Sequence, residues 1–288
     1  MTDTRQGSGV VVTGASSGIG AAIAGDLVRR GYRVFGTVRH AGDRAILQSV
    51  GATPVLMDVT DGEAIARAAA EVQRGLSGAP LAGLVNNAGI AVAGPLSLLP
   101  LEQLRQVLEV NLIGVLAVTQ AFIPLLRAGR GGGRVINISS IAGRQALPFM
   151  GPYVASKFGL EGMSDSLRRE LSLEGVHVVV IEPGSVQSKI WDKVETLDIS
   201  RYRGSVYWPI LERFRQAALR GAKRAPSAEI VARAVGRALE ARRPPLRIVV
   251  AGQPILTRLM LRIPDRILDW LIARALRRMA ARSERSTH

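Results

Sequence analysis

The sequence predicts a single α/β domain in which helices cover both faces of a parallel β-sheet. Short apolar runs rich in β-branched residues alternate with longer segments of helical periodicity through most of the 288 residues. This alternation is typical of strands joined by right-handed helical crossovers. Hydrophobic residues make up 47% of the chain and charged residues 21%, which favours a globular protein over a disordered one.

The first half of the chain supplies four expected strands and three helices. We expect strands over 9–13, 32–38, 54–57 and 81–86, and helices over 19–30, 44–50 and 63–74. Gly31 follows the first helix, where glycine commonly forms the C-terminal cap because it adopts a left-handed backbone without steric penalty.

The second half continues the alternation and then departs from it. We expect helices over 101–127, 153–172 and 228–241, and strands over 134–139, 176–182 and 247–250. Residues 185–224 form a long insertion after the sixth strand, and residues 253–288 form a basic, amphipathic tail. No repeat or low-complexity linker appears, so the sequence indicates one main domain over 1–252 and an extension over 253–288.

The composition excludes some kinds of site but does not identify a binding partner. Lysine and arginine total 38 against 23 acidic residues, a formal charge of +15, which favours anionic partners such as nucleotides, nucleic acids or acidic membranes. The alternative is an ordinary soluble protein from an arginine-rich proteome. The absence of cysteine excludes disulfides, thiolate chemistry and zinc sites built on cysteine. The three histidines are scattered, so we expect no metal site.

Two uncharged stretches, 81–101 and 110–126, approach the length of a membrane helix. The first contains Asn86 and Pro95, which suit a buried strand and loop. The second contains Asn111 and Pro124, and we interpret it as a helix hidden in the core or a subunit interface. The polar N-terminal segment does not resemble a signal peptide, so we expect a cytoplasmic protein.

A glycine-rich turn lies between the first strand and the first helix, in the segment Thr-Gly-Ala-Ser-Ser-Gly-Ile-Gly over 13–20. Gly14, Gly18 and Gly20 leave room for a phosphate to approach the backbone at a helix N-terminus. A turn of this kind can serve geometry alone, but its position after the first strand favours dinucleotide binding.

The spacing G-x-x-x-G-x-G resembles that of the short-chain dehydrogenase/reductase family, and further motifs continue the resemblance in order over about 8–190. They are Asp58-Val59, Asn86-Asn87-Ala88-Gly89, Asn111, Ser140, Tyr153, Lys157 and Pro183-Gly184. The segment from Tyr153 to Gly184 is most similar to the 17β-hydroxysteroid and retinol dehydrogenase branch. The resemblance implies a doubly wound Rossmann-type catalytic domain, a homodimer or homotetramer, and oligomer contacts through the helices that contain Asn111 and Tyr153.

The end of the second strand predicts the cofactor. Enzymes that use NAD commonly place an acid there to bind the ribose 2′-hydroxyl, whereas this chain has Val38 followed by Arg39. A guanidinium holds a 2′-phosphate by paired hydrogen bonds, so we expect NADP(H), with Ser17 as a helper. The alternative is that Arg39 is a solvated surface residue.

Other cofactor contacts are implied by the resemblance alone. Asp58 and Val59 would meet the adenine, and Val186 and Ser188 the nicotinamide carboxamide. The remaining expected contacts with the cofactor are Ser16, Ile19, Asn86, Ala88, Gly89, Pro183 and Gly184.

Tyr153 and Lys157 lie four residues apart, on one face of a helix. A tyrosine with a pKa of ~10 is a poor base near neutrality, and we expect the Lys157 ammonium to lower that pKa. Ser140 would hold the substrate oxygen, with Ser139 as the competing candidate. By resemblance, Lys157 also binds the nicotinamide ribose. The resemblance further implies that Asn111 holds a water in a proton relay, although it could be only a satisfied polar group in a helix.

These residues predict hydride transfer between nicotinamide and a carbonyl or secondary alcohol, with Tyr153 as general acid or base. A non-catalytic NADP(H)-binding regulator on the same fold is the alternative, but it would be expected to lose Tyr153, Lys157 or Ser140. A lyase or epimerase of the wider superfamily is less favoured, because those chains are often longer.

Two segments bear on substrate and location. Residues 190–214 hold five of the twelve aromatic residues, Trp191, Tyr202, Tyr207, Trp208 and Phe214. They suit either a helical lid over a bulky apolar substrate such as a steroid, retinoid or lipid alcohol, or ordinary packing. The tail over 264–282 places apolar residues at helical spacing among arginines. It could contact a membrane surface, the core or a partner subunit. No recognised module accompanies the charge, so we expect no nucleic-acid binding.

Overall fold

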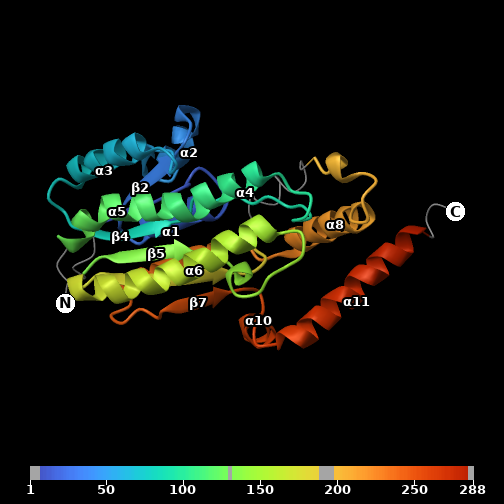
Figure 1. Ribbon diagram of the computed structural model, residues 1–288. Coiled ribbons are helices and arrows are strands. Elements are labelled where there is room, and N and C mark those ends of the chain that lie inside the picture. Colours follow the sequence, from blue (N-terminus) through green and yellow to red (C-terminus); the bar gives the residue numbers. More distant parts are fainter. Residues whose placement is uncertain (1–6, 129–131, 188–197, 285–288) are drawn as a thin grey trace.

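The computed structural model describes residues 7–128, 132–187 and 198–284, and it contains one seven-stranded sheet (Figure 1). Every pair of neighbouring strands is parallel, and the order is β3-β2-β1-β4-β5-β6-β7. The strands are β1 (Gly9–Val12), β2 (Arg33–Val38), β3 (Thr53–Leu56), β4 (Leu81–Asn86), β5 (Arg134–Ile138), β6 (His177–Pro183) and β7 (Arg247–Val250). The predicted doubly wound parallel sheet is therefore confirmed.

Helices pack on both faces of this sheet because its strands are apolar on both sides. One face is covered by α1 (Gly18–Arg29), α2 (Arg44–Ser49) and α9 (Glu229–Glu240), which share a core with β1 and β6. The other face is covered by α3 (Gly62–Leu76), α5 (Gly114–Arg127) and α6 (Gly151–Leu171), around a core that includes Phe122 and Leu126.

The long helix expected over 101–127 is continuous but irregular. It consists of α4 (Leu101–Leu108), a π-helical turn (Glu109–Ile113) and α5. Among the described residues, Leu101–Arg127 is the one helix long and apolar enough to cross a membrane. It lies against β4, with α3 and α6 beside it, which agrees with the first of the two expected positions, a helix of the core.

The last helices lie beyond the carboxyl ends of the strands (Figure 1). The insertion contains a 3₁₀ turn (Ser200–Tyr202) and α8 (Trp208–Arg224), and the tail contains α10 (Pro254–Met260) and α11 (Asp265–Glu284). An apolar cluster joins them, since Leu276 of α11 packs against a group that includes Tyr202 and Leu211. The Arg213 guanidinium of α8 also donates to the Met279 carbonyl of α11. The tail therefore docks on the insertion.

Candidate active site

A pocket of about 400 Å³ opens at the carboxyl edge of the sheet, where the loops after β1 and β4 diverge. The strand order reverses at this point, and open α/β sheets bind ligands there. Its walls come from the loops that follow β1 to β6, from α6, and from Phe214 of α8. Residues far apart in sequence thus share one cavity, because every parallel strand ends at the same edge.

The glycine-rich turn forms one wall of the pocket, and two of its glycines have a left-handed backbone. The φ angles are +62° at Gly14 and +54° at Gly18. A Cβ on Gly14 would lie 2.9 Å from the Ala88 Cα, and one on Gly20 would lie 2.3 Å from the Gly14 carbonyl oxygen. Glycine is favoured at Gly14 by both the left-handed backbone and the close approach, at Gly18 by the backbone and at Gly20 by the close approach.

The side chains of Thr13 and Asn87 fix this turn to β4. The Thr13 hydroxyl accepts hydrogen bonds from the backbone N–H groups of Asn87 and Ala88, each at 2.9 Å. The Asn87 amide donates to the carbonyls of Thr13 at 2.9 Å and Gly14 at 3.1 Å. Sequence reasoning gave neither side chain a role.

Asn86, an expected cofactor contact, lies in the core, and its predicted role stays a proposal. Its amide donates to Thr119 at 3.0 Å and Asn137 at 2.9 Å, and the residue is buried away from the pocket lining. Successive side chains on a strand face opposite sides, so Asn86 shares the face of Leu84, which packs in the core beneath α5. Strand alternation was the signal that could have shown Asn86 to be a core residue.

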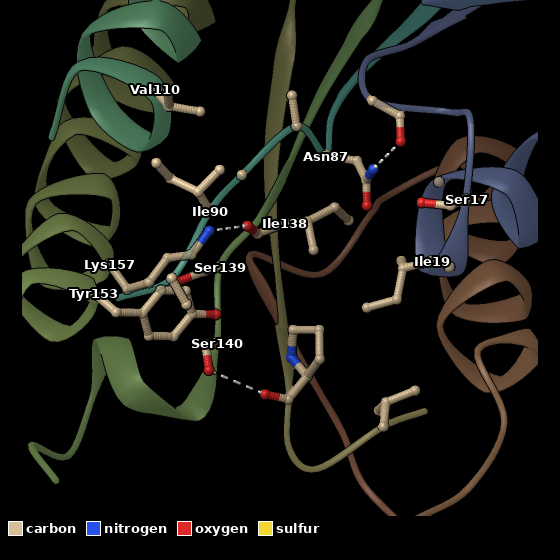
Figure 2. A pocket seen from close by; sticks show the side chains of 18 of the residues that line it. Ser17, Ile19, Asn87, Ile90, Val110, Ile138, Ser139, Ser140, Tyr153 and Lys157 are labelled. Atoms are coloured by element: carbon tan, nitrogen blue, oxygen red, sulfur yellow. Dashed lines mark hydrogen bonds between the residues drawn. The ribbon is translucent and has the colours of Figure 1, made fainter. Parts of the chain in front are cut away.

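The first turn of α1 points its free N–H groups at the pocket. Ser17 occupies the N-cap position, and its side chain makes no capping hydrogen bond to the described backbone. Ser16, Ser17 and Ile19 all line the cavity, as Figure 2 shows for Ser17 and Ile19. Unused donors and a helix dipole make this turn suitable for a phosphate.

Arg39 lines the far end of the pocket with His40, Asp43 and Asp58. Partial burial alone would raise the pKa of Asp58. Hydrogen bonds from the Thr60 N–H and hydroxyl, together with the charges of Arg39 and His40, outweigh this effect and lower that pKa. Asp58 is thus an anion close to Arg39, at the position predicted to meet adenine.

Ser140, Tyr153 and Lys157 come together at the opposite end of the pocket, as Figure 2 shows. The Ser140 hydroxyl accepts from the Ala142 N–H at 3.1 Å and lies 3.4 Å from the Pro183 carbonyl. It also lies close enough to the Tyr153 hydroxyl to lower the pKa of that group. Ser139 Oγ is buried without a partner among the described residues, so Ser140 is the serine that engages the tyrosine.

The expected effect of Lys157 on Tyr153 is corrected for the protein alone. Burial raises the pKa of Tyr153 above its usual 10, and the nearby Ser140 hydroxyl offsets only part of this rise. Burial likewise lowers the pKa of Lys157 to about 8, against the opposing charge of Glu161. The Lys157 ammonium lies 5.6 Å from the tyrosine ring centroid and donates to the Ile138 carbonyl at 2.8 Å. Burial therefore sets the direction of both pKa shifts.

Asn111 lies in the π-helical turn, is completely buried, and is outside the pocket lining. Its side chain accepts from the Ile90 N–H and donates to the Ile90 carbonyl, both at 2.8 Å, and to Ser156 Oγ at 3.0 Å. The contacts in the structure thus fix the pocket wall at Ile90 to α6. The relay predicted for Asn111 stays a proposal.

A partly buried ion cluster behind Lys157 was missed by sequence reasoning. Arg247 of β7 bonds to Glu161 and Asp165 of α6, each at 2.9 Å. Glu182, fully buried at the end of β6, lies 3.2 Å from Arg144 and 3.5 Å from Arg247. Burial and the charge of Glu161 raise the pKa of Glu182. The cluster clamps the catalytic helix to two strands and to the loop after Ser140.

The remaining predicted cofactor residues line the same cavity, with one exception. These are Gly14, Gly18, Gly20, Val59, Ala88, Gly89, Pro183, Gly184 and Val186. Ser188 lies outside the described residues, as does Trp191 of the aromatic segment.

The substrate end of the pocket is closed by an aromatic cluster. Phe214 lines the cavity and packs edge to face with Phe149, with ring centroids 5.6 Å apart. Phe149 has a left-handed backbone, with φ of +65°, and its carbonyl accepts from the Gly94 N–H at 2.8 Å. A side chain of this size rarely adopts that conformation, so the surrounding packing must hold it.

A family model described as short chain dehydrogenase matches residues 8–197. An NADPH-dependent 3-dehydrocapnine reductase from Ornithobacterium rhinotracheale is 37% identical over 280 residues, which cover 95% of this chain and 99% of that protein. Retinol dehydrogenase 16 from Mus musculus is 44% identical over 179 residues, covering 61% of this chain and 56% of that protein.

Solved structures agree with these relatives. A short chain dehydrogenase/reductase from Burkholderia phymatum in complex with NAD has a TM-score of 0.76 at 26% identity, covering 92% of this chain and 96% of that one. A short chain dehydrogenase from Burkholderia cenocepacia in complex with NADP has a TM-score of 0.70 at 27% identity, covering 93% and 98%. The fold over most of the chain is thus that of these enzymes.

Proposed function

Because this chain belongs to the short-chain dehydrogenase family, we propose that it is an NADP(H)-dependent oxidoreductase that interconverts a carbonyl and an alcohol. The meeting of Ser140, Tyr153 and Lys157 at one end of the pocket carries this proposal. The retention of all three argues against the alternative, a regulator that binds the nucleotide without turnover.

The pocket has the groups that NADP(H) needs. The N-terminus of α1 would hold the pyrophosphate, and Arg39, helped by Ser17, would hold the 2′-phosphate. The loop after β3 would meet the adenine, and the segment after Pro183 the nicotinamide carboxamide. The name of the reductase relative, which states NADPH dependence, supports this choice.

The chain's own residues then supply one proton to the substrate. The bound cofactor supplies the hydride that reaches the carbonyl carbon. Ser140 holds the carbonyl oxygen, and the Tyr153 hydroxyl donates its proton to that oxygen as negative charge develops on it. The raised pKa of Tyr153 keeps the hydroxyl protonated at neutral pH, as an acid requires.

Lys157 returns a proton to Tyr153 after each reduction. With a pKa of about 8, its ammonium is mostly charged at neutral pH and releases a proton at modest cost. We propose that a water held near Asn111 reloads Lys157 from solvent, and oxidation of an alcohol runs the same steps in reverse.

A bulky apolar compound is the proposed substrate, because the wall at the substrate end combines Leu147, Met150 and Phe214 with the aromatic cluster behind them. A homodimer or homotetramer through α4–α5 and α6 fits the exposed Ile113 and Phe158 on those helices. A cytoplasmic location with peripheral membrane contact through the tail completes the proposal.

The test is titration of the purified protein with NADPH and NADH, followed by turnover assays with steroid, retinoid and simple ketones. We expect tighter binding of NADPH and turnover of at least one apolar ketone. Tight binding without turnover across the panel would favour the regulator, and absence of binding by either nucleotide would overturn the proposal.

A further inference from the structure

The tail carries an exposed apolar surface that the domain leaves uncovered. Its members are Ile255, Leu256, Leu259, Ile267, Trp270 and Leu271, which we call the tail patch. Ile255 is 74% exposed and Trp270 is 58% exposed. Large apolar side chains gathered in this way mark a surface that meets something other than water.

The tail patch is distinct from the face by which α11 docks on the domain. Leu276 packs into the aromatic cluster beside α8, and Met279 accepts a hydrogen bond from Arg213. Ile267, Trp270 and Leu271 lie at a different angle around the helix and nearer its N-terminal end. Because docking uses one face, the second apolar stripe is left for a partner.

Arginines lie on the same two helices and in the turn between them. They are Arg258, Arg262, Arg266, Arg274, Arg277 and Arg278, all exposed. Within the described chain none of the six forms an ion pair, and Arg274 stacks over the Trp270 ring at 5.3 Å from its centroid. Only Asp265 and Asp269 oppose them in residues 253–280. The two helices of the tail therefore expose large apolar side chains together with arginines that are unpaired among the described residues.

The tail patch also adjoins the mouth of the pocket. The Gln145 side chain donates to the Met260 carbonyl at the end of α10, at 3.2 Å. Two residues further along the same loop, Leu147 lines the pocket and is 43% exposed. A compound entering past Leu147 would thus arrive from the side where α10 lies.

We propose that the tail patch lies on an anionic lipid bilayer and that the bilayer delivers the apolar substrate to the pocket. Apolar side chains and Trp270 enter the zone beneath the headgroups, while the arginines bind lipid phosphates. The delivery step rests on the proposed oxidoreductase activity, but the membrane contact does not.

The charges favour a bilayer over a second copy of the chain. A two-fold interface would place the same arginines opposite one another, and protein interfaces are depleted of charge at their centre. Anionic headgroups instead complement every one of these arginines.

The test measures co-sedimentation of the full chain with vesicles of phosphatidylcholine alone or with 30% phosphatidylglycerol. We expect binding to the anionic vesicles, at least tenfold tighter than to neutral ones. The variant Arg262→Gln/Arg266→Gln should bind about 30-fold more weakly. Its control, Arg242→Gln/Arg243→Gln, makes the same charge change before β7, at the opposite edge of the sheet, and should bind like the wild type.

Insertion is tested separately from charge. Brominated lipid should quench the fluorescence of the bound wild type, and Trp270→Phe should lose most of that quenching. Leu259→Asp/Ile267→Asp should abolish binding, whereas Leu173→Asp, at a residue that is 91% exposed at the other edge, should not. Equal binding to neutral and anionic vesicles, or tail-patch variants that change only the oligomer mass in light scattering, would overturn the proposal.

Delivery is tested with two ketones. A water-soluble ketone should be reduced equally by the wild type and Leu259→Asp/Ile267→Asp, whereas an apolar ketone offered in anionic vesicles should be reduced at least fivefold faster by the wild type. Turnover of neither ketone would refute the proposed function and leave the vesicle results standing. Equal turnover of the vesicle-borne ketone would refute delivery alone.

Discussion

The two ends of the pocket are built in different ways. At the nucleotide end, backbone groups are fixed by specific hydrogen bonds, since Thr13 and Asn87 lock the glycine turn to β4. At the substrate end, aromatic rings from α8 and the loop before α6 pack on one another, and the tail packs on them in turn. The first arrangement specifies one ligand shape, whereas the second can change its shape by exchanging side chains.

Because the two ends are built differently, we expect mutations that weaken cofactor binding to differ from those that weaken substrate binding. Tyr153 and Lys157 lie at the other end of the pocket from Arg39, where the nicotinamide would meet the substrate, and we call this pair the junction. Their helix is held by the partly buried cluster around Arg247. Changes at one end should leave the other intact, and only changes at the junction should stop the chemistry.

The largest expected effect comes from the junction. Tyr153→Phe removes the proton donor and keeps the ring, so turnover should fall by about 10²- to 10⁴-fold while the Kd for NADPH changes less than twofold. Steady-state kinetics and fluorescence titration measure the two quantities. Tyr207→Phe, which removes a hydroxyl outside the pocket lining, is the matched control. Unchanged turnover in Tyr153→Phe would remove the proposed mechanism.

The variant Arg39→Asp tests the nucleotide end alone. Loss of a charge-assisted pair and gain of a repelling carboxylate should weaken NADPH binding about 100-fold, and NADH should become the preferred cofactor. Arg44→Asp makes the same change on an exposed residue outside the pocket lining and should have little effect. If both variants keep the preference for NADPH, the role assigned to Arg39 is wrong.

The burial of the junction predicts a pH dependence of stability. The pKa of Lys157 is about 8 in the folded protein, whereas in the unfolded chain it has its ordinary value of 10.5. The unfolded chain therefore binds more protons between these values, so the free energy of unfolding should rise with pH there. The contribution is at most about 1.4 kcal/mol per pH unit.

Lys157→Met removes this titration and should flatten the difference between denaturant melts at pH 8 and pH 10. Subtracting the two proteins cancels the other groups that titrate in the same window. Identical slopes for both would mean that Lys157 is not held in a low-dielectric site.

The substrate end is tested by Phe214→Ala. Removal of a half-buried ring from the pocket wall should cost ~1 kcal/mol of apolar contact, so KM for an apolar ketone should rise about fivefold. The Kd for NADPH should stay the same. A comparable rise in the NADPH Kd would show that the two ends are coupled and that cofactor binding and substrate binding are not independent.

Sequence reasoning located the nucleotide end well because its determinants are local. Strand alternation with helices, the glycine spacing and the separation of Tyr153 from Lys157 are all short-range patterns. The predicted strands agree with the structure to within a few residues. Asn86 and Asn87 carry the same amide, and only the facing of β4 shows that Asn87 lines the pocket whereas Asn86 does not.

The rest depended on contacts between distant segments. The cluster of Glu161, Glu182, Arg144 and Arg247 joins four elements. No spacing of residues in the sequence predicts this cluster. The raised pKa of Tyr153 likewise follows from burial, which a helical pair of residues does not reveal. The packing of α11 on α8 depends on which of two apolar stripes meets the domain, and the sequence presents both.

The direction of β7 has a consequence for how such a chain changes its substrate. This last strand runs parallel to the others, so the chain leaves it at Val250 beside the mouth of the pocket, and Gly184 donates to the Val250 carbonyl there. Any segment added after the sheet is complete begins next to the reacting groups. Lengthening or replacing the C-terminus can therefore alter what enters the pocket without disturbing a single strand, which makes this terminus a natural place to graft new specificity.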